Sequence, residues 1–439
     1  MPYFAAIIRF FFRHVKHELK KLALGCAIVY NFNVIVEIDA FRIYDTACYQ
    51  RKGGDGVLKK VLPFLKEFVS RADMVLFTLC LVSSIFGIVM IGSATATSKA
   101  GSTGFVMVQT VALLIGIALF VLLTVLDVDL IADKWPILVG ISVLLLLALI
   151  PFGHDDGTGN KSWIRFLGIG IQPSEIVKVI YIVLMAKHIS YLREYKNLNH
   201  VFSVVQLAVH FIVPFALVVV ISSDLGSALI FLFIFIVMLF AAGLRIYWFI
   251  LGIAAMAAVI PFAWTHVLRA DQIARILAPY DSSIDPTGDD VMWQASQSKL
   301  ALASGQLVGT GLYNGPQTQS QAIPAQHTDF IFAVIGEELG MLGCCVVIVL
   351  LLLIILRCVM IGLRSKNTMS MLVCFGVAAT LLFQSFINIG MCLGITPVIG
   401  LTLPFFSYGG SSTFSLFAAV GLVSGVKFRP KPERFHRYE

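Results

Sequence analysis

Long runs of apolar residues recur along most of the chain, and they decide what it can fold into. A helix needs about 20 apolar residues to cross a bilayer, and these runs are far longer than the strands of a membrane barrel. A bilayer also offers no partner to open backbone groups. We therefore expect an all-α polytopic membrane protein. Its roughly ten transmembrane helices are expected over residues 73–93, 105–125, 135–151, 172–190, 201–222, 225–243, 246–266, 329–356, 369–390 and 405–426.

The distribution of positive charge predicts how these spans are oriented. If the ten spans alternate in direction, the loops on the same side of the membrane as the amino terminus contain most of the Lys and Arg residues. Because cytoplasmic loops are enriched in Lys and Arg, both termini are expected in the cytoplasm. The same rule places the large loop over residues 267–327, between spans seven and eight, outside. The few basic residues on that outer side are Lys99, Lys161, Arg165, Arg269, Arg275 and Lys299.

Three regions follow from this pattern. Residues 1–70 form a basic extension, and the helical periodicity near its end suits a cytoplasmic or interfacial helix. Residues 71–428 form the membrane domain, and residues 429–439 form a basic cytoplasmic tail. The net charge of +7 does not indicate a nucleic-acid partner, because the basic residues gather at span ends.

The stretch from Gln326 to Gly340 joins the outer loop to a long apolar run. Thr328 or Asp329 is placed to cap the incoming helix, so Asp329 would lie where the membrane begins. Glu337 would lie about 12 Å deeper. A carboxylate inside a spanning helix costs about 2.5–3.5 kcal/mol on insertion scales, so it normally faces a polar cavity. Asp329 is therefore either a helix cap alone or a functional carboxylate at the outer surface.

Other polar residues interrupt the apolar runs. Glu175 and Lys178 lie on one helix face near the start of the fourth span and are placed to pair. The pair is either a structural salt bridge or part of a functional cavity. Asp224, at the outer hinge between spans five and six, indicates by itself a turn or cap more often than a catalytic group. The outer loop, including residues 293–304, is expected to form a half-ordered amphipathic cover.

Five short motifs occur in order along the chain. They are Gln172-Pro173-Ser174-Glu175, Ser223-Asp224-Leu225-Gly226, His327-Thr328-Asp329-Phe330, Gly336-Glu337-Glu338 and Ser407-Tyr408-Gly409-Gly410-Ser411. Taken together, these motifs resemble those of the SEDS family, named for shape, elongation, division and sporulation, and the resemblance covers about residues 72–427. It implies a ten-span enzyme of the bacterial cytoplasmic membrane that polymerises peptidoglycan glycan strands from lipid II. It also implies inverting glycosyl transfer, with a class B penicillin-binding protein as transpeptidase partner.

Asp329 matches the presumed catalytic aspartate of that family, where it would act as general base. The leaving lipid pyrophosphate needs positive charge from Arg or Lys, or from a divalent cation such as Mg²⁺ or Mn²⁺. We assign no cofactor beyond this open choice, and no partner beyond lipid II, the transpeptidase and membrane lipids. Candidates that line the substrate cavity are Glu175, Lys178, Asp224, His327, Glu337, Trp163, Arg165, Ser407, Gly409 and Gly410.

The family pattern is not complete, and two other functions stay open. Ala325 and Ser162 stand where the family usually has Glu and Arg, and the loop motif over residues 285–294 is longer than usual. A flippase for lipid-linked precursors, or another transporter, would need charges near the midplane and inverted repeats, and we see no repeat. A scaffold that only positions a transpeptidase would leave Asp329 without a role. Within the family, a RodA-like elongation role is preferred to a division role.

Overall fold

The computed structural model describes residues 66–98, 101–154, 161–166, 169–266, 268–281, 283–288 and 291–428. The chain divides into two units, Met1–Glu67 and Phe68–Glu439, and the second is described below. The expected basic extension lies outside the described residues except for residues 66–70. The expected tail over residues 429–439 lies outside them as well.

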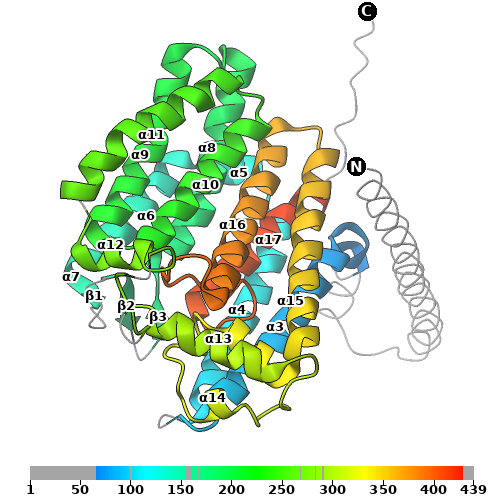
Figure 1. The fold of residues 1–439 in the computed structure, drawn as a ribbon. Helices are drawn as coiled ribbons and strands as arrows, with labels where there is room; N and C mark the ends of the chain where they lie inside the picture. The colour runs from blue at the N-terminus through cyan, green and yellow to red at the C-terminus, as the bar shows by residue number, and fades with distance from the viewer. Residues whose placement is uncertain are drawn as a thin grey trace, which may run out of the picture. The chain divides into compact units, whose positions relative to one another are not determined.

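Every expected span is a helix (Figure 1). Eight helices of the described part are long and apolar enough to cross a membrane. Of the other two, α10 is shorter, with 17 residues, and α8 has five charged residues along its length. The helices are α3 (Met74–Ala94), α4 (Ser102–Val125), α6 (Trp135–Leu147) with α7 (Leu149–Phe152), α8 (Pro173–Tyr195), α9 (Val201–Leu217) with the π-turn η1 (Val218–Ser222), α10 (Leu225–Ala241), α11 (Ile246–His266), α15 (Ile331–Arg364), α16 (Thr368–Leu393) and α17 (Gly410–Phe428).

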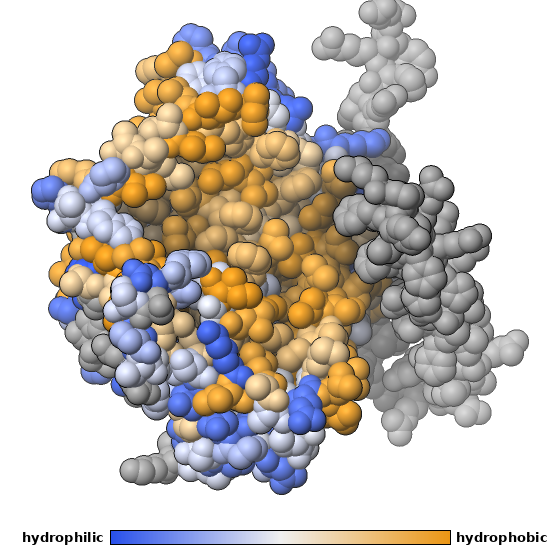
Figure 2. Space-filling model, viewed as in Figure 1, coloured by the Kyte–Doolittle hydropathy of each residue, from blue (hydrophilic) through white to orange (hydrophobic). Residues whose placement is uncertain are grey.

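Apolar side chains cover the middle of the molecule, as Figure 2 shows for one face. Hydrophilic residues gather at the two ends of that face. None of the described side chains of α11 is buried, and all of residues 250–262 are exposed. An apolar surface of this extent is stable only against lipid. The chain is therefore a multi-pass membrane protein, as the sequence predicts.

The last helix, α17, is at the centre of the bundle and packs most closely on α4. Glycines allow the close approach. A Cβ atom at Gly421 would lie 2.9 Å from the backbone of Phe120, and one at Gly116 would lie 3.1 Å from Phe417. Small residues let membrane helices approach in this way when no water is present to drive packing. The helix also contacts α3, α8, α15 and α16.

The helix α15 is broken at Gly340, which has φ 68° and ψ −167°. The break lies beside Leu307 and Gly309, which follow the end of α13 (Trp293–Gly305). One turn earlier, α13 itself reaches α15, where a Cβ atom at Gly305 would collide with the carbonyl oxygen of Gly336. The region was expected to be a half-ordered cover, but α13 is a regular helix packed on α15 and α16, with Ala295, Ser298 and Ala301 buried. Small residues on one face of α13 explain this difference.

The remaining short elements gather at one end of the bundle, at the bottom of Figure 1. The strands form one antiparallel sheet in the order β1-β2-β3. The loop between α11 and α15 contributes α12, α13 and α14 to the same end. The elements are β1 (Gly153–His154), β2 (Trp163–Phe166), β3 (Ile169–Ile171), α12 (Ala270–Leu277) and α14 (Pro316–Gln319); α5 (Val128–Asp133) follows α4.

Candidate active site around Asp329

Asp329 lies in the turn that leads into α15. The helix is capped by Phe330 without any side-chain hydrogen bond, so the expectation that Thr328 or Asp329 caps it is wrong. The backbone holds Asp329 instead. Its N–H donates to the Ala325 carbonyl over 3.0 Å, and its carbonyl accepts from the Asn388 side chain over 2.7 Å. The Asp329 carboxylate therefore does not cap the start of α15.

The segment between α16 and α17 runs beside this carboxylate. Gly400 has φ +67°, a conformation that side-chain-bearing residues rarely adopt. A Cβ atom at Gly400 would lie 3.6 Å from Asp329 Oδ2, so the glycine leaves room around that oxygen. The neighbouring Leu401 carbonyl accepts a 2.6 Å hydrogen bond from the same Asn388 amide. One buried side chain thus fixes both the Asp329 turn and the Gly400 segment.

Asp224 caps the helix α10, which is the turn or cap role that the sequence favoured for this residue. Its carboxylate accepts from the Ser227 N–H over 2.9 Å and from the Ser227 hydroxyl over 2.7 Å. The side-chain amide of Gln172 donates to it over 3.0 Å. These three hydrogen bonds fix the position of the Asp224 carboxylate at the start of α10.

The start of α10 packs on the same segment that runs beside Asp329. A Cβ atom at Gly226 would lie 2.7 Å from the carbonyl oxygen of Ile399, so only glycine allows this approach. The charge of Asp224 acts on Asp329 across this contact. The structure therefore brings together two carboxylates that are distant in the sequence.

The environment of Asp329 raises its pKa to about 6. Loss of water around the carboxylate is the largest cause, and the negative charge of Asp224 adds to it. A hydrogen bond from Thr328 acts in the opposite direction. A carboxylate with a pKa near 6 is ionised at neutral pH and is a stronger base than an ordinary aspartate.

The ring of His327, two residues before Asp329, belongs to a cluster of three rings. Its centroid lies 4.9 Å from that of Phe105 and 5.5 Å from that of Tyr408, and those two centroids are 5.2 Å apart. The Tyr408 N–H donates to the His327 carbonyl over 2.8 Å, which joins the start of α15 to the segment before α17. Burial lowers the pKa of His327, so the ring is neutral at pH 7.

The Ser407–Gly410 turn is held by Gln109 of α4. The Gly409 N–H donates to the side-chain oxygen Oε1 of Gln109 over 3.0 Å. The side-chain nitrogen of Gln109 donates to the Thr413 hydroxyl over 2.8 Å and to the Ser407 carbonyl over 3.3 Å. The Ser407 hydroxyl accepts from the Leu403 N–H over 2.8 Å. These bonds satisfy irregular backbone that lipid would not tolerate.

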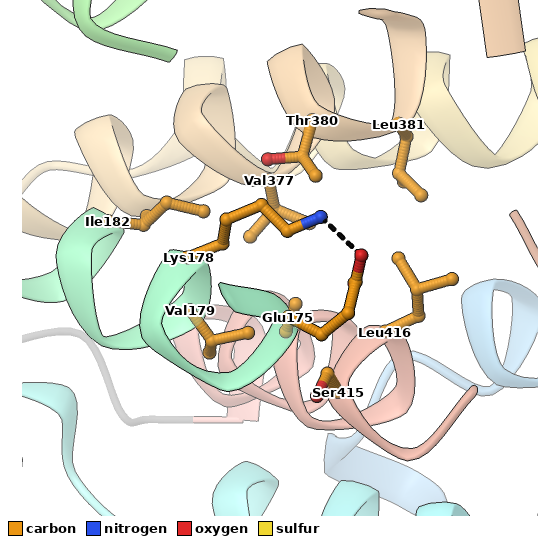
Figure 3. Close-up of a pocket in the computed structure, with 10 residues that line it drawn as sticks. Glu175, Lys178, Val179, Ile182, Val377, Thr380, Leu381, Ser415 and Leu416 are labelled. Atoms are coloured by element: carbon orange, nitrogen blue, oxygen red, sulfur yellow. Dashed lines mark hydrogen bonds and ion pairs between the residues drawn. The ribbon is translucent and has the colours of Figure 1, made fainter. Parts of the chain in front are cut away.

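Glu175 and Lys178 pair inside the bundle, 2.7 Å apart, with side chains only 6% and 2% exposed. Figure 3 shows the pair between α16 and α17, with Thr380 and Ser415 beside it. The cavity that they line has a volume of only about 10 Å³, and Asp329 is not among its lining residues. The pairing expectation is confirmed geometrically, but the pair lies apart from Asp329.

Glu337 is also separate from Asp329. Its carboxylate accepts from the backbone N–H groups of Gln317 and Thr318, both over 2.8 Å, and from the Thr318 hydroxyl over 2.6 Å. Glu337 is fully buried and tethers α14 to α15. A carboxylate saturated with donors in this way is a structural anchor.

Trp163 and Arg165 lie on β2. Arg165 pairs with Gly170 of β3, and the Trp163 ring lies over that glycine, 3.1 Å from where its Cβ atom would be. The Gln172 N–H then donates to Ser411 over 3.1 Å, which ties the end of this hairpin to the start of α17. The hairpin therefore shares an end of the bundle with Asp329.

Within the described part of the chain, no group of three His, Cys, Asp or Glu residues is arranged to hold a metal ion. Asp329 and Asp224 interact, but two carboxylates alone do not form a protein cage. Mg²⁺ is commonly bound by one or two carboxylates together with the phosphates of a substrate. The two aspartates fit only a cation that a pyrophosphate helps to hold.

Two functional side chains escaped the sequence analysis, Asn388 and Gln109. Both are almost fully buried, and both donate to backbone carbonyls of the site. Each is an amide inside an otherwise apolar predicted span. A neutral polar residue in such a span usually has a specific partner, because an unpaired amide in lipid is costly. An amide in an apolar run is visible in the sequence and could have indicated both residues.

Known proteins resemble this chain over most of its length. A 379-residue match, 35% identical, covers 84% of this chain and 97% of the probable peptidoglycan glycosyltransferase FtsW of Geobacter metallireducens. A 302-residue match, 33% identical, covers 67% of this chain and 78% of the peptidoglycan glycosyltransferase MrdB of Escherichia coli.

Solved structures have the same fold. One, described as the structural coordination of polymerization and crosslinking by a peptidoglycan synthase complex, matches with a TM-score of 0.67 and 29% identity, over 81% of this chain and 97% of that chain. The crystal structure of the rod shape determining protein RodA of Thermus thermophilus matches with a TM-score of 0.59 and 27% identity, over 81% of this chain and 96% of that chain.

The family of cell cycle proteins that includes FtsW, RodA and SpoVE matches residues 73–431. This match spans all the long helices described above and confirms the family expected from the five motifs. The chain belongs to the FtsW, RodA and SpoVE family.

Proposed function

We propose that this protein is a peptidoglycan glycosyltransferase that polymerises glycan strands from lipid II. Its family and its relatives named as peptidoglycan glycosyltransferases support this function. The single observation that carries the chemistry is the placement of Asp329 at the start of α15, with its pKa raised to about 6 and Gly400 leaving room at its oxygen.

Asp329 is proposed as the general base. Glycosyl transfer needs a group that removes the proton from the acceptor sugar hydroxyl as that oxygen attacks the donor sugar carbon. A base within about 3 Å of the hydroxyl contributes roughly 10²–10⁴-fold. The turn that carries Asp329 is fixed by Asn388, so the carboxylate is oriented before substrate binds. Attack from the face opposite to the leaving group inverts the configuration at the anomeric carbon.

The leaving undecaprenyl pyrophosphate needs positive charge, which the same end of the bundle can supply. The side chain of Lys299, on α13, lies against Gly394 at the end of α16. Arg165 lies on β2, and Arg269 and Arg275 lie at the start and end of α12. A divalent cation held between the pyrophosphate and the two aspartates would supply the same stabilisation. We propose these groups together as the pyrophosphate site.

Substrate delivery fixes the proposed orientation. Lipid II is polymerised at the outer surface, so the end that carries Asp329 is proposed to face outward and both termini to face the cytoplasm. A class B penicillin-binding protein is proposed as the transpeptidase partner. The solved structure described as a peptidoglycan synthase complex, whose polymerization and crosslinking are coordinated, supports this pairing.

A flippase or transporter fits the charged interior less well. Carrying a lipid headgroup would require an accessible cavity around midplane charges. The charged pair Glu175 and Lys178 lines a cavity of about 10 Å³, which is the space of one water molecule. The structure therefore provides no room for a disaccharide at that pair.

In the deciding experiment, the purified full-length protein and its transpeptidase partner are incubated with lipid II as the only substrate. We expect polymer to form and to be cut by a muramidase. Movement of lipid II across liposomes without any polymer would overturn the assignment and favour the flippase.

A further inference from the structure

A second cavity lies at the end of the bundle opposite to Asp329. Its volume is about 690 Å³, within the range of small-molecule sites. The helices α15 and α17 both begin at the Asp329 end and finish at this cavity, where Arg364 and Lys427 line it. The proposed polymerisation does not use it, since its chemistry takes place about 30 Å away along α16.

The floor of the cavity is a buried ion cluster around Asp73. This carboxylate is fully buried and accepts from Arg357 Nη2 over 2.7 Å and from Arg357 Nε over 3.1 Å. Lys427 Nζ lies 3.2 Å from the same carboxylate. Such a paired cluster is a rigid structural element. Arg357 and Lys427 therefore form ion pairs with Asp73 and also line the cavity.

The rim has cations of a different kind. Arg364 and Lys366 are exposed, and no carboxylate of the described residues pairs with either. Ser370, on the first turn of α16, lines the cavity next to them, as does Asn367, whose side chain caps α16 and donates to Asp129 over 3.2 Å. Among the described residues, the lining has four basic and three acidic side chains, which leaves one formal positive charge. Those charged residues are Arg357, Arg364, Lys366, Lys427, Asp73, Asp127 and Asp129.

Apolar surface adjoins these cations. Met360 lines the cavity and is 40% exposed, and Leu363, next to Arg364, is 67% exposed. Both lie on the last turns of α15, so exposed apolar surface directly adjoins the exposed cations. A soluble anion would not need such a surface, whereas a lipid presents its phosphate and its acyl chains together.

We propose that this cavity binds the phosphodiester headgroup of an anionic phospholipid from the leaflet opposite to Asp329. One negative charge balances the excess charge of the lining. Arg364 and Lys366 contact the phosphate, Ser370 receives a headgroup hydroxyl, and acyl chains pack on Met360. Basic pockets between helices at a membrane surface recognise lipid headgroups in this way.

The test measures lipid binding by native mass spectrometry on the full-length protein, so it does not depend on glycosyltransferase activity. Phosphatidylglycerol is compared with phosphatidylcholine of identical acyl chains. We expect phosphatidylglycerol to bind more tightly, and the double variant Arg364→Gln with Lys366→Gln to weaken its binding about tenfold to thirtyfold. The matched control removes two exposed cations outside the cavity, Arg193→Gln with Arg245→Gln, and should leave binding unchanged.

Three results would overturn the proposal. They are equal binding of the two lipids, unchanged binding by the double variant, and equal weakening by the control. Lys366→Glu, a single change at an exposed position, replaces the double variant if that variant does not fold, and it too should weaken phosphatidylglycerol binding. Competition with inorganic phosphate tests whether the cavity instead binds a soluble anion. Displacement of phosphatidylglycerol by millimolar phosphate would overturn the choice of a lipid.

Discussion

The side-chain amide of Asn388 lies 2.7 Å from the backbone carbonyl oxygen of Asp329 and donates a hydrogen bond to it. The same nitrogen donates to the Leu401 carbonyl over 2.6 Å. Asn388 therefore fixes the position of the proposed base relative to the segment that leaves its carboxylate open. We infer that Asn388 positions Asp329, since its hydrogen bond is to the backbone of that residue and not to the carboxylate.

Replacement of Asn388 tests this role. Asn388→Leu leaves two buried carbonyls without their donor, at about 1–3 kcal/mol each. We expect a lower melting temperature and a turnover loss larger than any change in KM. Gln384→Leu is the matched control, because Gln384 is a buried amide one helical turn away whose side chain has no partner among the described residues. That variant should be neutral or stabilising. Equal effects of the two changes would contradict a specific positioning role.

The pH dependence of polymerisation should report Asp329. The base works only when ionised, and its pKa is about 6. The rate should therefore rise with pH through about 6 and fall about tenfold per unit below that value. Asp224→Asn removes the negative charge that raises the pKa and keeps a capping side chain. The acid limb should then move to lower pH. An unmoved limb would show that Asp224 does not act on the base.

A double-mutant cycle tests the buried pair of Glu175 and Lys178. Glu175→Gln or Lys178→Met alone leaves an unpaired buried charge, which costs about 3–5 kcal/mol. The double variant should recover most of the stability measured by thermal unfolding in detergent. Polymerisation is measured in parallel. Single variants as stable as the unmodified protein would show the pair to be incidental.

The orientation can be tested with single cysteines at the two ends of the bundle. Ser320, beside α14, is exposed, and Lys366 is exposed at the opposite end. Ser320→Cys should react with an impermeant thiol reagent on intact cells, and Lys366→Cys only after lysis. The protein without added cysteines is the control for Cys345, which is exposed. The reverse pattern would place Asp329 on the cytoplasmic side.

The spans could be predicted from the sequence because the length of an apolar run is a local property. The interior of α15 could not. Its apolar run predicts one regular helix, with Glu337 on the face of a cavity. Gly340 breaks the helix beside Gly309, in the segment that follows α13, and Glu337 binds α14 instead. The close approach of this segment depends on glycines whose role is seen only when their neighbours are known.

The site was predictable in part for the same reason. Asp329 stands at a boundary between loop and span, so its importance is visible locally. Its interaction with Asp224 depends on the path of the segment near Gly400, which no local pattern specifies. The predicted cap of α15 was wrong for a similar reason. The cap is Phe330, and the preceding Asp329 carbonyl is bound by Asn388, a residue distant in the sequence.

The last prediction concerns Asp329 itself. Asp329→Asn should lower polymerisation by about 10²–10⁴-fold, because an amide cannot accept the acceptor proton. Binding of lipid II should change much less. The fold should survive, since the side chain does not cap α15. Asp281→Asn, at an exposed loop position, is the control for a generic loss of charge and should polymerise normally.

The same variant should gain stability, which separates loss of chemistry from loss of fold. The pKa of Asp329 is raised from 3.8 to about 6, so its ionised form destabilises the folded state by up to about 3 kcal/mol above pH 6. This cost disappears as the pH falls from about 6 toward 4, because the carboxyl is then protonated in the folded state. Thermal unfolding of Asp329→Asn should therefore occur at higher temperature at pH 8, with the difference lost near pH 4. Near-normal polymerisation by a protein with that stability gain would rule out Asp329 as the base and direct attention to Asp224.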